Sequence, residues 1–147
     1  MTGTVSQASN EAAVPPARDT RIRVGAVAIF VLLLAELLLG NQLAVVGSPY
    51  PVGYLAAHIV LSILLIGFTA HVLVRSTRLP SRPAKVVAGL TFLSAVGATI
   101  GGTVFLLSGG GSNALYAMEG LGGLAVLGAI LLIVFGSVEI PVKPATP

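Results

Sequence analysis

Four long apolar runs constrain this chain more than any other feature of its sequence. They cover residues of about 23–46, 52–74, 85–107 and 114–136. An α-helix needs roughly 20 mainly apolar residues to cross the hydrocarbon core of a bilayer, and each run is long enough. Only 9% of the 147 residues are charged, whereas a soluble domain carries about 25%. The sequence therefore predicts a small integral membrane protein.

Short connections between the runs determine the predicted architecture. They contain the segments GSPYP, RSTRLPSRPA and SGGGSN, which are rich in residues that break helices. Because short connections make consecutive helices antiparallel neighbours, the predicted fold is all-α, an up-down-up-down four-helix transmembrane bundle over residues 21–138. Residues 1–20 are rich in Ser, Thr, Ala and Pro and lack apolar periodicity, so we expect a disordered tail there. Residues 139–147 form a second predicted tail.

The basic residues predict how the chain is oriented. All eight lie before or at the start of the first run, between the second run and the start of the third, or after the fourth: Arg18, Arg21, Arg23, Arg75, Arg78, Arg82, Lys85 and Lys143. The other two connections carry no charge. By the positive-inside rule, both termini and both tails are cytoplasmic, and the chain is a multi-pass protein of the cell membrane. The basic residues are therefore expected to set the membrane topology and to lie near anionic headgroups of the lipid bilayer. No nucleic-acid partner is expected.

The absence of cysteine and of several catalytic motifs limits the reactions that this chain could catalyse. It has no cysteine, which excludes disulfides, thiolate metal sites and cysteine nucleophiles. It also has no phosphate-binding loop, zinc motif or nucleophilic triad. No catalytic residue is therefore predicted, and an enzyme is the less expected class.

Four side chains that could hold a ligand fall at one depth of the predicted bundle. Glu36 lies near the outer end of the first helix, His58 one or two turns into the second, and Met118 and Glu119 near the start of the fourth. Ionisable groups inside a membrane are costly, so they are candidates for function by default. A b-type heme iron accepts His and Met as its axial pair. His58 and Met118 are therefore candidate iron ligands of a heme b, with Glu36 and Glu119 beside them as further cofactor-binding residues.

Helical periodicity gives each candidate ligand an inward-facing stripe. On the second helix the stripe contains His58, Ser62, Leu65 and Thr69, and on the fourth it contains Met118, Gly122, Ala125 and Ala129. The small residues after Met118 would let a flat porphyrin approach the helix.

The second histidine does not share this site. His71 follows His58 by 13 residues, which is about 20 Å along a helix and about 220° around it. With only two histidines, one chain cannot hold two bis-histidine hemes. We expect His71 to lie near the lipid headgroups.

The four predicted helices resemble one half of a heme A synthase. The similar residues are Glu36, the connection GSPYP, His58 within YLAAHIVLS, and the segment SGGGSNALYAMEGLGGLAVL. The resemblance implies a four-helix bundle with heme ligands on its second and fourth helices, and a place in respiratory-chain assembly. The chain departs from the Glu-x-x-His-Arg motif of that family, since Leu55 and Ile59 replace its Glu and Arg. The fourth-helix histidine is replaced, with Tyr116 or Met118 nearest, and the outer cysteines are missing. Heme-modifying catalysis is therefore not expected.

Two other functions are compatible with the sequence. The chain could be a non-catalytic subunit or scaffold, in which the GxxxG pair of Gly97 and Gly101 contacts a partner membrane protein or a second copy. Alternatively, Glu36, His58 and Glu119 could relay protons, serve a small transporter, or hydrogen-bond a quinone headgroup.

Overall fold

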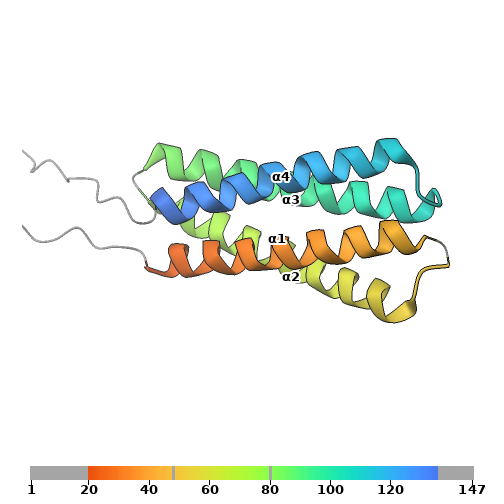
Figure 1. Cartoon of the computed structure of the whole chain (residues 1–147). Helices are drawn as coiled ribbons and strands as arrows, with labels where there is room; N and C mark the ends of the chain where they lie inside the picture. Colours follow the sequence, from red (N-terminus) through yellow and green to blue (C-terminus); the bar gives the residue numbers. More distant parts are fainter. Residues whose placement is uncertain (1–19, 48, 80, 136–147) are drawn as a thin grey trace, which may run out of the picture.

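The chain folds as four long antiparallel helices (Figure 1). The computed structural model describes residues 20–47, 49–79 and 81–135. The helices are α1 (Thr20–Val46), α2 (Val52–Ser76), α3 (Arg82–Leu107) and α4 (Ser112–Phe135). The predicted all-α, up-down four-helix bundle is confirmed. Apart from Thr20, which begins α1, the segments predicted as tails lie outside the described residues.

The helices form a ring in which each packs against two neighbours. α1 contacts α2 and α4, and α3 contacts α2 and α4, with the most extensive contact between α3 and α4. The start of α1 and the end of α4 therefore lie at the same end of the bundle (Figure 1). This arrangement encloses one interior, to which all four helices contribute.

Local sequence explains where the helices begin and end. Pro51 immediately precedes α2, where no helix hydrogen bond is needed from its nitrogen. Ser81 caps α3, because its hydroxyl accepts a hydrogen bond from the backbone N–H of Ala84 at 3.4 Å. α1 is followed by Gly47, whose φ of +70° is a left-handed conformation that glycine adopts without strain.

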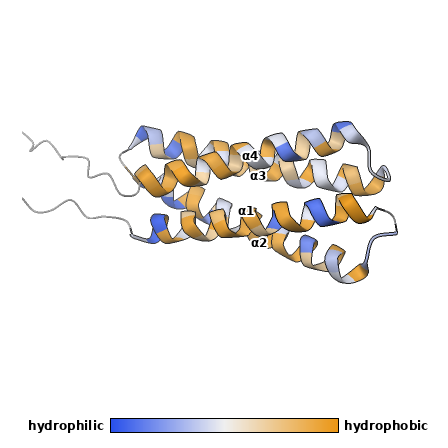
Figure 2. Cartoon of the chain, viewed as in Figure 1, coloured by the Kyte–Doolittle hydropathy of each residue, from blue (hydrophilic) through white to orange (hydrophobic). Residues whose placement is uncertain are grey.

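All four helices are long and apolar enough to cross a membrane. Between 17% and 28% of the most apolar window of each helix is buried inside the bundle, so most of its apolar surface faces outward. Figure 2 shows hydrophobic residues over the length of the helices. A soluble bundle would keep its large apolar residues inside, whereas Leu38, Leu93 and Leu124 are exposed here. The protein is therefore a small integral membrane protein with four spans.

The interior contains many small residues, which lets the helices approach closely. A Cβ atom on Gly97 would lie 2.8 Å from the Leu121 side chain, and one on Gly101 would lie 3.3 Å from the backbone nitrogen of Met118. The GxxxG pair predicted to contact a partner helix therefore packs against α4 of its own chain. Within the described chain, these two glycines let α3 and α4 approach closely.

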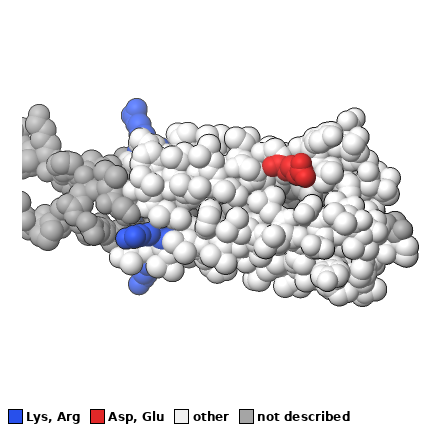
Figure 3. Space-filling view, viewed as in Figure 1, with Lys and Arg blue, Asp and Glu red and all other residues white. Residues whose placement is uncertain are grey.

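The described basic residues gather at one end of the bundle. They belong to the start of α1, the end of α2 and the start of α3: Arg21, Arg23, Arg75, Arg78, Arg82 and Lys85. On the face shown in Figure 3, Lys and Arg lie only at this end. The charge asymmetry predicted along the bundle axis is thus present in the folded chain.

Candidate functional site

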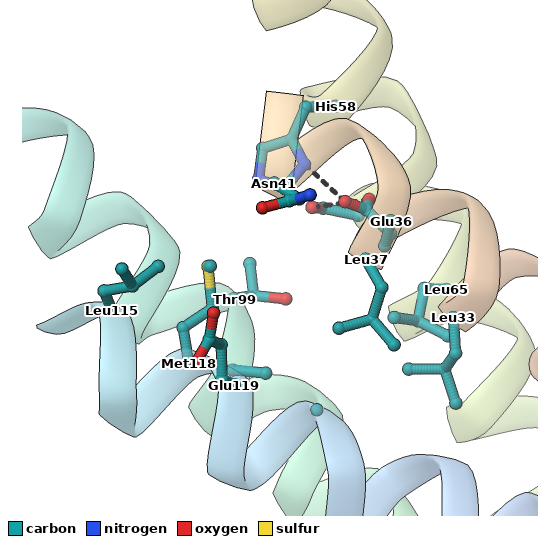
Figure 4. Close-up of a pocket in the computed structure, with 13 residues that line it drawn as sticks. Leu33, Glu36, Leu37, Asn41, His58, Leu65, Thr99, Leu115, Met118 and Glu119 are labelled. Carbon is teal, nitrogen blue, oxygen red and sulfur yellow. Dashed lines mark hydrogen bonds and ion pairs between the residues drawn. The ribbon is translucent and has the colours of Figure 1, made fainter. Parts of the chain in front are cut away.

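A cavity of about 360 Å³ lies between the helices, in the half of the bundle away from the basic end. All four helices line it, and its wall includes all four residues predicted as cofactor-binding: Glu36, His58, Met118 and Glu119. Leucines supply much of the apolar part of the wall (Figure 4). His58 and Glu36 lie on one side of the cavity and Met118 and Glu119 on the other.

A buried contact between a carboxylate and an imidazole joins α1 to α2 at this cavity. The carboxylate oxygen Oε2 of Glu36 contacts Nδ1 of His58, and the Glu36 residue is only 9% exposed. Neither of these two atoms has a hydrogen-bond partner elsewhere in the described part of the chain. Each atom therefore depends on the other for its polar contact.

Ser62 completes this polar group. Its hydroxyl donates a hydrogen bond of 2.9 Å to Oε1, the other carboxylate oxygen of Glu36. Ser62 follows His58 by one helical turn, so both side chains leave the same face of α2. Glu36 is consequently held at both oxygens by one helix face, which fixes the orientation of the His58 ring.

The His58 ring and the Met118 side chain both lie near two glycines of neighbouring helices. A Cβ atom placed on Gly102 of α3 would lie 3.7 Å from Nε2 of His58 and 3.2 Å from Sδ of Met118. A Cβ atom on Gly40 of α1 would similarly lie 4.0 Å from the imidazole and 3.7 Å from the Met118 methyl. The imidazole and the thioether therefore both border a small space that two glycines keep open.

Glu119 differs from the other three residues. It lines the same cavity but is exposed. It makes no hydrogen bond or ion pair with another described residue. Glu119 therefore shares the cavity with Glu36 and His58 but is not bonded to them, whereas Ser62 is bonded to Glu36.

His71 lies away from this site, near the basic end. It is exposed, and the Nε–H of Arg75 donates to its Nε2 atom at 3.2 Å. The 13 residues that separate it from His58 place the two histidines at different depths of α2.

Several residues of the site were not singled out as functional by the sequence. Ser62 could be placed on the inward stripe of α2, but its bond to Glu36 depends on how α1 is rotated. Gly40 and Gly102 were indistinguishable from the other glycines of the helices. Among the described residues, no group of three or more His, Cys, Asp or Glu side chains could hold a bare metal ion. An iron bound here would therefore have to arrive with most of its own ligands.

Comparison with known protein families, curated proteins and solved structures finds no match to this chain. The sequence and structure together place it as a four-helix bundle with four candidate membrane spans, and no family is identified.

Proposed function

We propose that this protein binds one b-type heme in the cavity and serves electron transfer or assembly in a respiratory chain. The observation that supports this most is the presentation of His58. Glu36 engages Nδ1 of the ring, while Nε2 and the Met118 sulfur both lie close to the Cβ position of Gly102. Histidines that bind metals usually bond a carboxylate or carbonyl through their other nitrogen, because this fixes the tautomer and the ring orientation.

The residues around His58 are consistent with a heme. Imidazole and thioether are an established axial pair for heme iron. The cavity volume of about 360 Å³ lies within the usual range for small-molecule sites, about 300–1,000 Å³. The layout also resembles half of a heme A synthase, which is the second line of support. A bound heme would supply one-electron chemistry, and the chain would hold the iron, orient its ligand and exclude water.

An absorption spectrum tests this proposal directly. The full chain would be expressed with heme supplied, purified in detergent, and measured oxidised and after reduction with dithionite. A Soret band with sharp reduced bands is expected. Met118→Leu should keep the heme but lose the low-spin spectrum, because leucine has no ligand atom. A colourless preparation despite available heme would exclude the proposal.

The two histidines provide a matched control. His58→Ala is expected to abolish heme binding, whereas His71→Ala should leave the spectrum unchanged because His71 lies outside the cavity. Equal loss of colour in both variants would show that the heme is not bound at this site.

A proton relay or a quinone-headgroup site is the second candidate function. It is favoured by the two carboxylates on one cavity, because Glu36 is buried and Glu119 is exposed. Protons could pass between the surface and the His58 ring along such a wall. In proteoliposomes containing a pH-sensitive dye, a relay would give proton flux that Glu36→Gln removes. Unchanged flux in that variant would eliminate this candidate.

A further inference from the structure

A second hollow lies between α1 and α2 near the basic end, and the heme proposal does not involve it. Its volume is about 290 Å³, and it is lined by Thr20, Arg21, Val24, Gly25, Phe68 and His71. We call these six residues the α1–α2 groove. A cavity with one polar end and one apolar end, at the end of a membrane bundle, has the chemistry of a lipid site.

The polar end of the groove can hold an anion. Arg21 comes from the first turn of α1, and His71 comes from the last third of α2. Arg75 is bonded to His71 through its Nε–H, at 3.2 Å. A guanidinium has four further N–H donors after this bond. Two helices thus bring two arginines and an imidazole to one place, and such groups recognise phosphate.

The bond from Arg75 also determines what His71 can offer. Because Nε2 of His71 accepts that hydrogen bond, the neutral ring carries its proton on Nδ1. Nδ1–H is then a donor that suits a phosphate oxygen. His71, an otherwise unexplained intramembrane histidine, thereby gains a binding role.

The apolar part of the groove suits an acyl chain. Phe68 is 40% exposed and Val24 is 63% exposed, so both present apolar surface along the groove. Gly25, which also lines the groove, is buried, and a Cβ atom there would lie 2.6 Å from the Val72 side chain. The two helices therefore approach closely at Gly25.

From this arrangement we infer that the α1–α2 groove is a specific site for an anionic phospholipid. Its phosphate binds Arg21, Arg75 and Nδ1–H of His71, and one acyl chain lies on Phe68 and Val24. A general attraction of the basic end to anionic lipids would involve all its basic residues equally, whereas this site depends on two of them.

Native mass spectrometry of the full chain in detergent tests this inference, with dioctanoyl phosphatidylglycerol as the probe. Binding is expected to be saturable, with one lipid per chain, and stronger than that of dioctanoyl phosphatidylcholine. Arg21→Gln with Arg75→Gln should weaken it about 25-fold, roughly fivefold for each charge. The control is Arg23→Gln with Arg78→Gln, which removes the same charge from the same end of the same helices, at residues that neither line the groove nor bond His71.

Two outcomes would overturn the inference. Equal weakening in both double variants would show that only the summed charge matters. Equal binding of glycerophosphoglycerol, which has no acyl chains, would show a simple anion site instead of a lipid site. His71→Phe, which keeps an aromatic ring but removes the donor, should weaken phosphatidylglycerol binding while circular dichroism confirms the helical fold.

Discussion

The carboxylate of Glu36 on α1 pairs with the imidazole of His58 on α2 inside the bundle, and Ser62 bonds its second oxygen. A polar pair at this depth is costly unless both partners are present. The pair thus connects two helices and at the same time determines which ring nitrogen faces the cavity.

His58→Leu should destabilise the bundle because it leaves a buried carboxylate oxygen without its partner. The expected loss in the free energy of unfolding is about 1–3 kcal/mol. Glu36→Leu combined with His58→Leu should recover part of this loss, because both polar groups are then gone. Unfolding in detergent, followed by circular dichroism, measures the effect. Glu119→Gln, at an exposed position, serves as the control. A double variant that is less stable to unfolding than His58→Leu would contradict the pairing of Glu36 with His58.

Gly102→Leu should close the space between His58 and Met118. The first added carbon would already lie 3.2 Å from the Met118 sulfur. The remaining carbons of the leucine would have to occupy the same space between His58 and Met118. Under the heme proposal, the Soret band is lost while the helical content stays. Gly89→Leu is the matched control on α3, because no atom lies within 4 Å of its Cβ position. Retained heme in Gly102→Leu would place the ligand elsewhere.

Gly128→Ala should separate α3 from α4. The added carbon would lie 2.2 Å from the Thr91 hydroxyl oxygen and 3.2 Å from its Cβ atom, which does not move with the rotamer, so a rotamer change alone does not relieve the contact. Overpacking of this kind costs about 1–3 kcal/mol. Thermal unfolding should show the loss, and Thr91→Ala in the same chain should restore part of it. Gly123→Ala, with nothing within 4 Å, is the control and should be neutral.

The positive-inside rule predicts that the basic end faces the cytoplasm and the cavity half faces outward. The absence of cysteine makes this simple to test with single introduced thiols. Ser112→Cys, at the exposed start of α4, should react with a membrane-impermeant maleimide in intact cells. Thr77→Cys, at the exposed end of α2, should react only after permeabilisation. The reverse labelling pattern would invert the orientation.

Hydropathy and helical period were sufficient to predict the four spans, their antiparallel order and the inward stripes. Leu65 and Thr69 are buried on α2, and Gly122, Ala125 and Ala129 are buried on α4. This worked because depth along a helix follows from counting residues, and the face follows from the same 3.6-residue period. The shared depth of Glu36, His58 and Met118 was therefore readable from the sequence.

Only the tertiary structure decided which of these groups meet. Met118 and Glu119 are adjacent in sequence and about 100° apart around α4, so depth alone does not tell which one faces the imidazole. Ser62, not Glu119, bonds Glu36, and Gly97 and Gly101 pack against α4 of the same chain. Such contacts depend on the rotation of each helix about its axis relative to its neighbours. That rotation is set by the fit of small and large side chains across the whole interface, which no single stretch of the sequence contains.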